Sequence, residues 1–554
     1  MNIDSAPTNT NNVGIRDETI DEKRQQQLHH SGTSRDWRIC GLRKRTVLAL
    51  AGLLLAVVVC AIVIPTVLVS KNDHESSSSS SGTEQQQPPA PTATPETPTG
   101  PTYDNHFEGD DLIYGQGKFN NSARVNARTP PLTEPFDYGG DDKIRGVNLG
   151  GWLVIEPFIT PGLFDQFEPS AKVVDEWTLC AKLGPEEAKR QLEHHYQTFV
   201  TEKDFKKIAD MGLNHVRIPV GHWAVRKKDP HGQEPFVPNI SYQYLLRGIQ
   251  WARRYGLRVM VELHTAPGSQ NGWNHSGKLG TVGFLNGTHG DENAAATKAI
   301  VKEMVEFFSK PEWAPVVTLF GVLNEPAIYR LDKNRVRTWY QESYSALRGE
   351  GGHNGKSNNN NKTSNGPWLT YHEGFLGLSA WDGFFNNEQH KRVILETHTY
   401  LIFDQGLVSM PRDEQAEFPC TGWMDDLSKA SEHAGPTMVG EFSVATNDCG
   451  KYLNGVGLGT RYEGTLWVDG KKEPAVCEDC SCGDSEQWKT YDDDYKEFLL
   501  NFVSRQMFAF ESSTFGWFFW TYKTENHINP HWDYLLGYEQ KWMPKDASQR
   551  DIDC

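Results

Sequence analysis

The stretch Val317-Thr-Leu-Phe-Gly-Val-Leu-Asn-Glu-Pro326 determines the fold that we expect. Its first seven residues are mostly apolar and predict a buried β-strand. Pro326 stops this strand, because proline has no N–H group to donate to a neighbouring strand. Asn324 and Glu325 therefore stand at the carboxyl end of a strand that is apolar on both faces, as the strands of a parallel sheet are.

Short apolar runs of the same kind recur from about residue 140 onward. Amphipathic helical patterns separate several of them, as at Pro185–Val200, Ile240–Tyr255 and Ala294–Phe308. Strand and helix in alternation predict a parallel sheet that is covered by helices. The predicted strands are Ile144–Leu149, His215–Val220, Arg258–Leu263, Val317–Leu323, Arg392–Glu396, Thr437–Gly440 and Phe515–Trp520.

The polar residues at the strand ends distinguish a closed barrel from an open sheet. In a (β/α)8 barrel all strand carboxyl ends open on one face, so their side chains converge. An open doubly wound sheet favours Gly-x-Gly-x-x-Gly in its first turn, and the Gly-rich stretch at 146–152 lacks that spacing. We therefore expect an α/β fold, a (β/α)8 TIM barrel over residues 131–554. The polar and aromatic residues that follow its strands are Arg217, His264, Asn324, Glu325, His398, Tyr400, Glu441 and Trp520.

The segment before the barrel predicts a membrane anchor. Residues 1–45 are polar and lack hydrophobic periodicity, which is typical of a disordered tail. Residues 46–69 carry no charge, and as a helix they would be about 36 Å long, enough for a hydrocarbon core of roughly 30 Å. The basic run at 43–45 keeps the tail cytoplasmic by the positive-inside rule. We expect a single-pass type II signal anchor in the plasma membrane, with the lipid bilayer as its partner.

Two other interpretations of residues 46–69 are a buried core helix and a cleaved signal peptide. Disordered-looking flanks disfavour the core helix, and a lead-in of 45 residues is long for a signal peptide. Residues 70–130 follow as a stalk and linker, with a serine run at 76–81 and then a Pro- and Thr-rich stretch. This composition is typical of an extended, O-glycosylated spacer. The barrel is then expected outside the cell, facing the cell wall.

Sequons and cysteines agree with an extracellular barrel. Seven cysteines follow the predicted span, and an oxidising compartment should pair most of them, with at least one left over. Cys477-x-x-Cys480-x-Cys482 could also suggest a metal knuckle, but no second cluster completes four ligands, so disulfides are favoured. The candidate N-glycosylation sites are Asn120, Asn239, Asn274, Asn286 and Asn361.

Charge and motifs exclude several classes of function. The formal net charge of −17 argues against nucleic-acid binding, which needs clustered Lys and Arg. We find no metal motif, no nucleotide-binding loop and no serine-centred elbow, so no cofactor is expected. The sequence makes no prediction of an oligomeric state.

Glu325 and Glu441 are the candidate catalytic pair. Hydrolysis of a glycosidic bond needs one protonated carboxyl group for the leaving oxygen and one ionised carboxylate for the cationic sugar. A single Glu at a strand end is usually just an exposed residue. Two of them, each after a strand that is predicted to be buried, favour the glycosidase interpretation.

Seven ordered motifs resemble glycoside hydrolase family 5, in its fungal exo-β-1,3-glucanase (glucan 1,3-β-glucosidase) branch. The resemblance extends over essentially all of residues 140–554. The motifs are Arg145–Pro157, Val216–Pro219, Leu263–Gly272, Asn324-Glu325-Pro326, His398-Thr-Tyr400, Gly440-Glu441-Phe442-Ser443 and Phe519–Asn526.

The resemblance implies a retaining reaction with Glu441 as nucleophile and Glu325 as acid/base. Arg217 is the candidate for keeping Glu441 ionised, because a nearby cation lowers a carboxyl pKa. The remaining expected roles concern the sugar and the nucleophile. Tyr400 donates to Glu441, His264 and His398 order the sugar hydroxyls, Asn324 contacts the 2-hydroxyl, Glu156 accepts from the terminal glucose, and Trp520 is the stacking floor.

Trp273 and Phe403 occupy the positions where the family holds the next glucose between two rings, although core packing is equally expected for Phe403. The sequence departs from the family at Asn274, where Asp is usual, and this Asn opens a sequon whose glycan would crowd the cleft. It also carries a Gly/Asn-rich insertion at 350–366, expected to be a surface loop.

The function that these residues predict is an exo-acting β-1,3-glucan hydrolase that releases glucose from cell-wall glucan. An alternative is the same machinery on a β-1,6 or β-1,4 glucan or on a glucosyl lipid. A catalytically inactive, glucan-binding surface protein belongs to a different class. The presence of both Glu, Arg217 and Asn324 argues against it.

Overall fold

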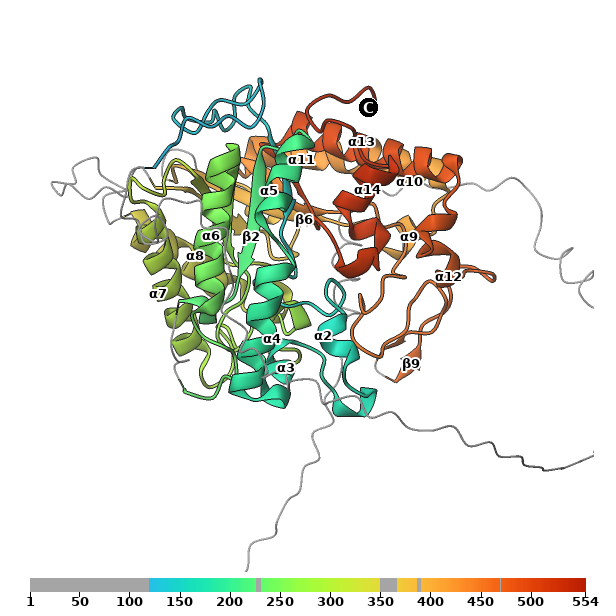
Figure 1. The fold of residues 1–554 in the computed structure, drawn as a ribbon, viewed down its shortest axis with the longest axis horizontal. Helices are drawn as coiled ribbons and strands as arrows, with labels where there is room; N and C mark the ends of the chain where they lie inside the picture. Colours follow the sequence, from blue (N-terminus) through green and yellow to red (C-terminus); the bar gives the residue numbers. More distant parts are fainter. Residues whose placement is uncertain (1–118, 226–230, 349–365, 386–389, 469) are drawn as a thin grey trace, which may run out of the picture. The chain divides into compact units, whose positions relative to one another are not determined.

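The computed structural model describes residues 119–554 except 226–230, 349–365, 386–389 and 469 (Figure 1). Eight parallel strands form a closed barrel in the order β1-β10-β7-β6-β5-β4-β3-β2. The predicted (β/α)8 barrel is therefore confirmed. Its strands are β1 (Ile144–Asn148), β2 (His215–Val220), β3 (Arg258–Leu263), β4 (Val317–Gly321), β5 (Trp368–His372), β6 (Val393–Thr399), β7 (Thr437–Phe442) and β10 (Gly516–Phe519).

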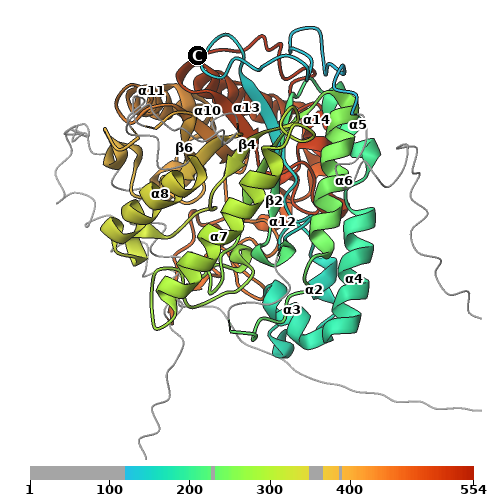
Figure 2. The ribbon, with the colours of Figure 1, turned by 90° about the vertical axis from the view of Figure 1, so that its left-hand side faces the viewer.

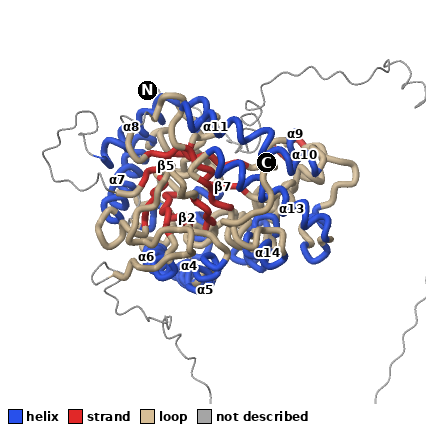
Figure 3. Tube along the Cα trace, turned by 90° about the horizontal axis from the view of Figure 1, so that it is seen from above, coloured by secondary structure: helices blue, strands red, loops and turns tan. Residues whose placement is uncertain are grey.

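Helices surround the strands, as the view from above shows (Figure 3). Figure 2 shows α4, α6 and α7 along one flank of the barrel. A separate two-stranded sheet, β8 (Trp467–Val468) and β9 (Lys471–Lys472), lies in the segment between β7 and α13. The helices are α2 (Gly162–Asp165), α3 (Glu176–Leu183), α4 (Pro185–Thr198), α5 (Glu202–Asp210), α6 (Ile240–Tyr255), α7 (Gly290–Phe308), α8 (Lys333–Arg348), α9 (Gln405–Val408), α10 (Arg412–Phe418), α11 (Met424–His433), α12 (Cys482–Ser485), α13 (Asp493–Ser513) and α14 (Tyr534–Gln540).

The eighth strand, β5, was missing from the sequence analysis. Its residues Trp368-Leu-Thr-Tyr-His372 mix apolar and polar types, so no continuous apolar run marks them. The strand forms because β4 and β6 pair with it on both sides, with Phe320 opposite Leu369 and Tyr371 opposite Leu395. Tertiary pairing here outweighs a weak local signal.

Three predicted site residues lie within strands, and two of them, His398 and Glu441, were expected just beyond the strand ends. Arg217 is the third residue of β2, His398 belongs to β6, and Glu441 belongs to β7. Alternate side chains of a barrel strand point into the barrel, so a residue within a strand can reach the same interior. The pairing of His398 with Glu441 in the register of β6 and β7 brings these two residues together.

An apolar cluster fills the barrel near the amino ends of its strands. Six of its members come from the first three residues of six different strands, and Phe136 completes it. All of these side chains are buried, so this end of the barrel is a packed core. The strand members are Ile144, Met260, Leu319, Ile394, Met438 and Phe518.

Part of the segment assigned to the linker contacts the barrel. The ring of Phe119 lies 6.0 Å from that of Trp313, and Arg128 donates to the carbonyl of Ser548 at 3.0 Å. The tail (1–45), the predicted span (46–69) and most of the stalk lie outside the described residues. Among the residues that are described, no helix has both the length and the apolar character that a bilayer crossing requires.

Six of the seven cysteines after the predicted span form disulfides, as expected. The pairs are Cys420–Cys554, Cys449–Cys482 and Cys477–Cys480, and the thiol of Cys180 is buried in α3. Cys477 and Cys480 therefore bond to each other, which leaves no metal knuckle.

The candidate glycosylation sites differ in exposure. Asn120 and Asn286 are exposed, and Asn239 is half-buried. Asn361 and nearly all of the 350–366 insertion lie outside the described residues.

Candidate active site

A cavity of about 550 Å³ opens at the carboxyl ends of the strands. It brings together nine of the residues that the sequence analysis singled out. Arg217 and His398 do not line it, because their side chains are fully buried beneath it. The nine are Glu156, His264, Trp273, Asn324, Glu325, Tyr400, Phe403, Glu441 and Trp520.

The local backbone geometry at Glu325 and the close packing at residue 440 account for two features of the sequence around the glutamates. Glu325 has a φ of +41°, a left-handed conformation that is uncommon for a residue with a side chain. Asn271 holds it there by donating to its carbonyl at 3.1 Å. Glycine precedes Glu441 because a Cβ atom at residue 440 would come within 2.0 Å of the carboxylate of Glu396.

Arg217 lies between Glu441 and polar residues from other strands of the barrel. Its Nη1 donates to Glu441 at 3.0 Å and to Asn148 at 2.9 Å, and its Nη2 donates to Asn324 at 2.9 Å. The same Nη2 lies 3.2 Å from Glu396 and 3.6 Å from Glu262. Burial lowers the pKa of Arg217, but the surrounding carboxylates outweigh burial and raise it, so the guanidinium stays charged.

The two catalytic candidates share His398. Its Nδ1 lies 2.8 Å from Oε1 of Glu325 and 3.3 Å from Oε2 of Glu441. These two oxygens are therefore at most about 6 Å apart, a limit that is compatible with the separation of roughly 5–5.5 Å in retaining glycosidases. The hydroxyl of Tyr400 donates to Glu441 at 2.8 Å.

Burial and nearby charges have opposite effects on the pKa values of Glu441 and His398. Burial raises the pKa of Glu441, although His398 and Arg217 act in the opposite direction. Burial also disfavours a charged His398, but its contacts with Glu441, Glu325 and Glu396 outweigh this and raise its pKa to about 10. His398 is therefore a second buried cation beside Glu441, and not only a residue that could order sugar hydroxyls.

Sequence reasoning missed two buried carboxyl groups below the pair, Glu262 and Glu396. Burial raises the pKa of Glu262 to about 8. Burial acts the same way on Glu396, but Arg217 and His398 outweigh it and lower its pKa to about 2. Glu396 was the last residue of a predicted strand and Glu262 lay inside another. The alternation of side chains along these strands was the signal that could have placed both carboxyl groups inside the barrel.

The deep end of the cavity contains Glu156, His264 and Trp520. The imidazole of His264 stacks on the indole of Trp520 at 5.6 Å and 6°. Burial, followed by the charge of Arg217, lowers the pKa of His264 to about 3, so this ring is neutral. Burial and the nearby Glu441 and Glu325 raise the pKa of Glu156 well above its usual range, which favours its protonated form.

Aromatic rings border the outer part of the cavity. Trp273 packs against Phe375 at 5.4 Å, and Phe403 lies 5.6 Å from Tyr400. Asn274 lines the cavity, so a glycan on it would crowd this opening, as the sequence analysis expected. The next residue, His275, was not predicted, and its Nε2 lies 3.3 Å from Oε2 of Glu325.

Glu325, His372 and His398 are close enough to suggest a buried metal site. The hydrogen bonds argue otherwise, because Nδ1 of His372 accepts from the backbone N–H of Gly374 at 2.9 Å. A neutral imidazole that accepts at Nδ1 carries its proton on Nε2, which then has no lone pair for a metal. The group fits a hydrogen-bonded network around the acidic pair.

Two carboxyl groups this close, in an aromatic-lined cavity at the carboxyl end of a (β/α)8 barrel, define the class of a barrel glycosidase. The family model for cellulase (glycosyl hydrolase family 5) matches residues 182–458, half of the chain. The chain therefore belongs to glycosyl hydrolase family 5.

Curated relatives agree with this assignment. The chain is 40% identical over 462 residues to the probable glucan 1,3-beta-glucosidase D of Neosartorya fischeri. It is 39% identical over 462 residues to the glucan 1,3-beta-glucosidase D of Emericella nidulans. Each match covers 82% of this chain and 53% of the relative, so the chain spans about half the length of these curated relatives.

Among solved structures, the rutinosidase from Aspergillus niger matches with a TM-score of 0.53 and 18% identity. That match covers 74% of this chain and 99% of the rutinosidase chain. At this identity the likeness concerns the fold alone.

Proposed function

We propose that the protein is a retaining, exo-acting β-1,3-glucan hydrolase that releases glucose from the non-reducing ends of cell-wall β-glucan. The observation that carries this proposal is the unequal setting of the two close carboxyl groups. Both oxygens of Glu441 accept hydrogen bonds, from Arg217 at 3.0 Å and from Tyr400 at 2.8 Å. Glu325 faces two histidines, one of them the half-buried His275 beside the cavity.

This difference supports the following roles in a double displacement. Burial raises the pKa of Glu441, and His398 and Arg217 oppose this shift. In the proposed mechanism the Glu441 carboxylate attacks C1 of the glucose while Glu325 protonates the leaving oxygen. In the second step Glu325 takes a proton from water, and the water oxygen attacks C1 to release Glu441 and β-glucose. Arg217 holds the side-chain oxygen of Asn324 at 2.9 Å, and Asn324, which lines the cavity, is our candidate for contacting the 2-hydroxyl in the first step.

Exo action is supported by the deep end of the cavity. The Oε1 atom of Glu156 is buried and has no hydrogen-bond partner among the described residues. A hydroxyl of a terminal glucose would satisfy it, and an unsatisfied buried oxygen costs about 1–3 kcal/mol. The indole of Trp520 gives the same sugar a flat face for stacking.

The proposed substrate draws support from the curated relatives, whose names specify glucan 1,3-beta-glucosidase activity. We test it with the purified full-length chain in a non-glycosidic detergent, using laminarin, pustulan and cello-oligosaccharides. The proposal expects glucose from laminarin, with the β-anomer appearing first in proton NMR spectra.

Each alternative gives a different result in this assay. Hydrolysis of pustulan or cello-oligosaccharides without laminarin would reassign the linkage. The α-anomer appearing first would overturn the retaining mechanism. Glucan binding without any hydrolysis would identify a binding protein.

We also propose a type II location in the plasma membrane, with the barrel facing the cell wall. Its support is the uncharged segment 46–69 and the basic run before it. Protease treatment of intact spheroplasts should release the barrel into the medium. Protection of the barrel until the cells are lysed would overturn this location.

A further inference from the structure

Two histidines and a glutamate from separate loops meet at the surface of the protein. His231 lies in the loop between β2 and α6, His289 directly precedes α7, and Glu292 is in the first turn of that helix. Oε2 of Glu292 lies 3.1 Å from Nδ1 of His289 and 3.6 Å from Nε2 of His231. The two imidazole rings are 4.1 Å apart. We call these three side chains the histidine cluster.

The spacing within the histidine cluster fits a transition-metal ion. One nitrogen or oxygen atom from each of its three side chains lies within 4.8 Å of the other two. Atoms that bind a tetrahedral zinc ion at about 2.0–2.2 Å lie about 3.3–3.5 Å from one another. The two distances to Glu292 fall on either side of this range. Small side-chain rotations would therefore be enough to close the cluster around an ion.

The donor atoms of the cluster also select the kind of ion. Imidazole nitrogens suit zinc, copper and nickel, whereas magnesium and calcium prefer oxygen ligands. Glu292 adds a negative charge, and its neighbour Asp291 pairs instead with Arg335. The side chains of His231, His289 and Glu292 are 28%, 55% and 63% exposed, which leaves room for water as a fourth ligand.

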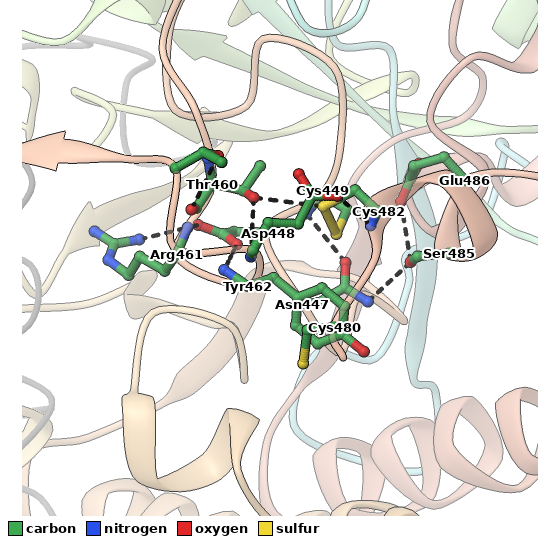
Figure 4. The surroundings of a disulfide bond; sticks show 12 residues. Asn447, Asp448, Cys449, Thr460, Arg461, Tyr462, Cys480, Cys482, Ser485 and Glu486 are labelled. Carbon is green, nitrogen blue, oxygen red and sulfur yellow. Dashed lines mark hydrogen bonds and ion pairs between the residues drawn. A yellow bond between two sulfur atoms is a disulfide. The ribbon is translucent and has the colours of Figure 1, made fainter. Parts of the chain in front are cut away.

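The long loops after β2 and β7 differ in how they are fixed. After β7, the Cys449–Cys482 disulfide closes the loop, and Asp448 accepts from the backbone N–H of Arg461 at 2.8 Å (Figure 4). Residues 221–239, after β2, include no cysteine. A metal ion in the histidine cluster would give this second loop a cross-link to α7, as the disulfide does for the first.

The loop after β2 packs behind one wall of the active-site cavity. Its Phe236 stacks on Trp223 at 3.8 Å and lies 5.5 Å from Trp177. The backbone N–H of Trp177 donates to the carbonyl of Gly277 at 2.9 Å. Gly277 ends the turn that begins at Asn274, which lines the cavity. An ion in the histidine cluster would therefore restrict a loop that supports this wall.

We propose that His231, His289 and Glu292 bind a zinc ion, with water as the fourth ligand, and that the ion ties the loop after β2 to α7. The site is structural and takes no part in the reaction. No sequence motif indicated it, because its ligands come from two separate loops that only the fold brings together. The inference does not depend on the proposed substrate.

The test measures zinc binding to the purified full-length chain, without a histidine tag, in a non-glycosidic detergent. Calorimetric titration with ZnCl₂ should show one bound equivalent in wild type that is weakened at least tenfold in His231→Ala, His289→Ala and Glu292→Gln. Loss of a residue that merely orients a zinc ligand already costs about 10–100-fold in affinity. Zinc should also raise the melting temperature of wild type more than that of the variants, because it binds the folded state.

His433→Ala is the matched control, because His433 is also exposed but lies at the end of α11 and is not part of the cluster. It should bind zinc as wild type does. Equal binding by wild type and all three cluster variants would overturn the inference, as would a wild type that binds no zinc. A loss in His433→Ala as large as that in the cluster variants would also overturn it.

Measurements without zinc separate binding from folding. The three replaced side chains are exposed, so each variant should match wild type in melting temperature and in its rate on laminarin when zinc is absent. Glu292→Gln keeps the size of the side chain, so it decides the outcome if a histidine variant does not fold. Zinc binding without laminarin activity keeps this inference and removes the glucan substrate, and the opposite result keeps the hydrolase and removes the zinc site.

Discussion

The two ends of the barrel use the same strands for opposite purposes. On β3, Met260 belongs to the apolar cluster, and Glu262, two residues later, belongs to the ionisable side chains around Arg217. On β6 the same step separates Ile394 from Glu396. Because alternate residues of a strand point into the barrel, a change of two positions exchanges a packed core for a buried network of charges.

The difference shows where stability and reactivity reside. The amino end gains stability from burying apolar surface, at about 25 cal/mol per Å². The carboxyl end loses stability because desolvated carboxylates cost several kcal/mol each unless cations offset them. Substitutions at the amino end should therefore change unfolding, and substitutions at the carboxyl end should change catalysis.

The largest expected effect is that of Glu441→Gln at the carboxyl end. An amide cannot form the glycosyl–enzyme bond, so kcat on laminarin should fall by about 10⁴-fold or more, equivalent to roughly 5 kcal/mol. The melting temperature should stay the same or rise, because one of several crowded carboxyl groups is removed. Initial rates and thermal melts of the same preparation measure the two effects.

Asn286→Gln serves as the control for this pair of measurements, since Asn286 is exposed and distant in sequence from both glutamates. It should leave both rate and melting temperature as they are. If Glu441→Gln kept more than a tenth of wild-type kcat, Glu441 would not be the nucleophile.

The second prediction concerns Met260 at the amino end. Met260 is fully buried in the apolar cluster, so Met260→Ala should lower the free energy of unfolding by about 2–5 kcal/mol. Well below the melting temperature, kcat/KM should stay within about two-fold of wild type. Urea unfolding gives the first quantity, and assays at 25 °C give the second.

A loss of activity as large as the loss of stability would contradict the separation of the two ends. Met410→Ala is the comparison variant, because Met410 is only half-buried. Its cost in stability should be clearly smaller than that of Met260→Ala.

The third prediction tests the residue that joins the charged groups. Arg217 donates to Glu441, Asn148 and Asn324 from two nitrogens. Lysine has a single ammonium group and cannot reproduce this fork, so Arg217→Lys should lower kcat by about 10²-fold, near 3 kcal/mol. It should also lower stability, unlike Glu441→Gln, because it leaves buried carboxylates without their donor.

The pH dependence of kcat separates a positioning role from a general defect. If Arg217 holds Glu441 ionised, Arg217→Lys should move the acidic limb of the kcat profile to higher pH. A lowered rate with an unchanged profile would assign Arg217 to structure alone.

Much of the fold and of the site could be predicted from the sequence, because apolar runs mark the strands and polar residues beside Pro or Gly mark their ends. Glu325 before Pro326 and Glu441 after Gly440 both converge on the cavity as expected. The Gly440 context is also explained, because a side chain there would collide with Glu396. A periodic pattern and a breaker are local signals, so they can be recognised without tertiary information.

What the sequence did not reveal depends on contacts between distant elements. β5 is a strand because its neighbours pair with it, and its own residues give a weak signal. His275 approaches Glu325 through the turn after Trp273, and no periodicity predicts such a contact. Glu262 looked like an ordinary polar residue within a strand, and only the closed barrel places it 3.6 Å from Arg217.

The last prediction concerns the pH dependence of stability that Glu262 causes, and its sign is defined. An unfolded Glu releases its proton near pH 4.5, whereas burial keeps folded Glu262 protonated up to about pH 8. Between these values the folded state binds one more proton than the unfolded state, so stability falls as pH rises. Relative to Glu262→Gln, wild type should lose up to about 1.4 kcal/mol per pH unit across this window.

The matched variant is Glu396→Gln, where the sign reverses. Arg217 and His398 overcome burial and hold the pKa of Glu396 at about 2, so its contribution is present above pH 4.5 and lost as pH falls toward 2. Urea unfolding between pH 3 and 8 should therefore show wild type and Glu262→Gln diverging at the alkaline side, and wild type and Glu396→Gln converging at the acidic side. Parallel curves for Glu262→Gln would mean that folded Glu262 ionises as it does in the unfolded chain. The buried charges at the carboxyl end would then be balanced by Arg217 and His398 without a proton on Glu262.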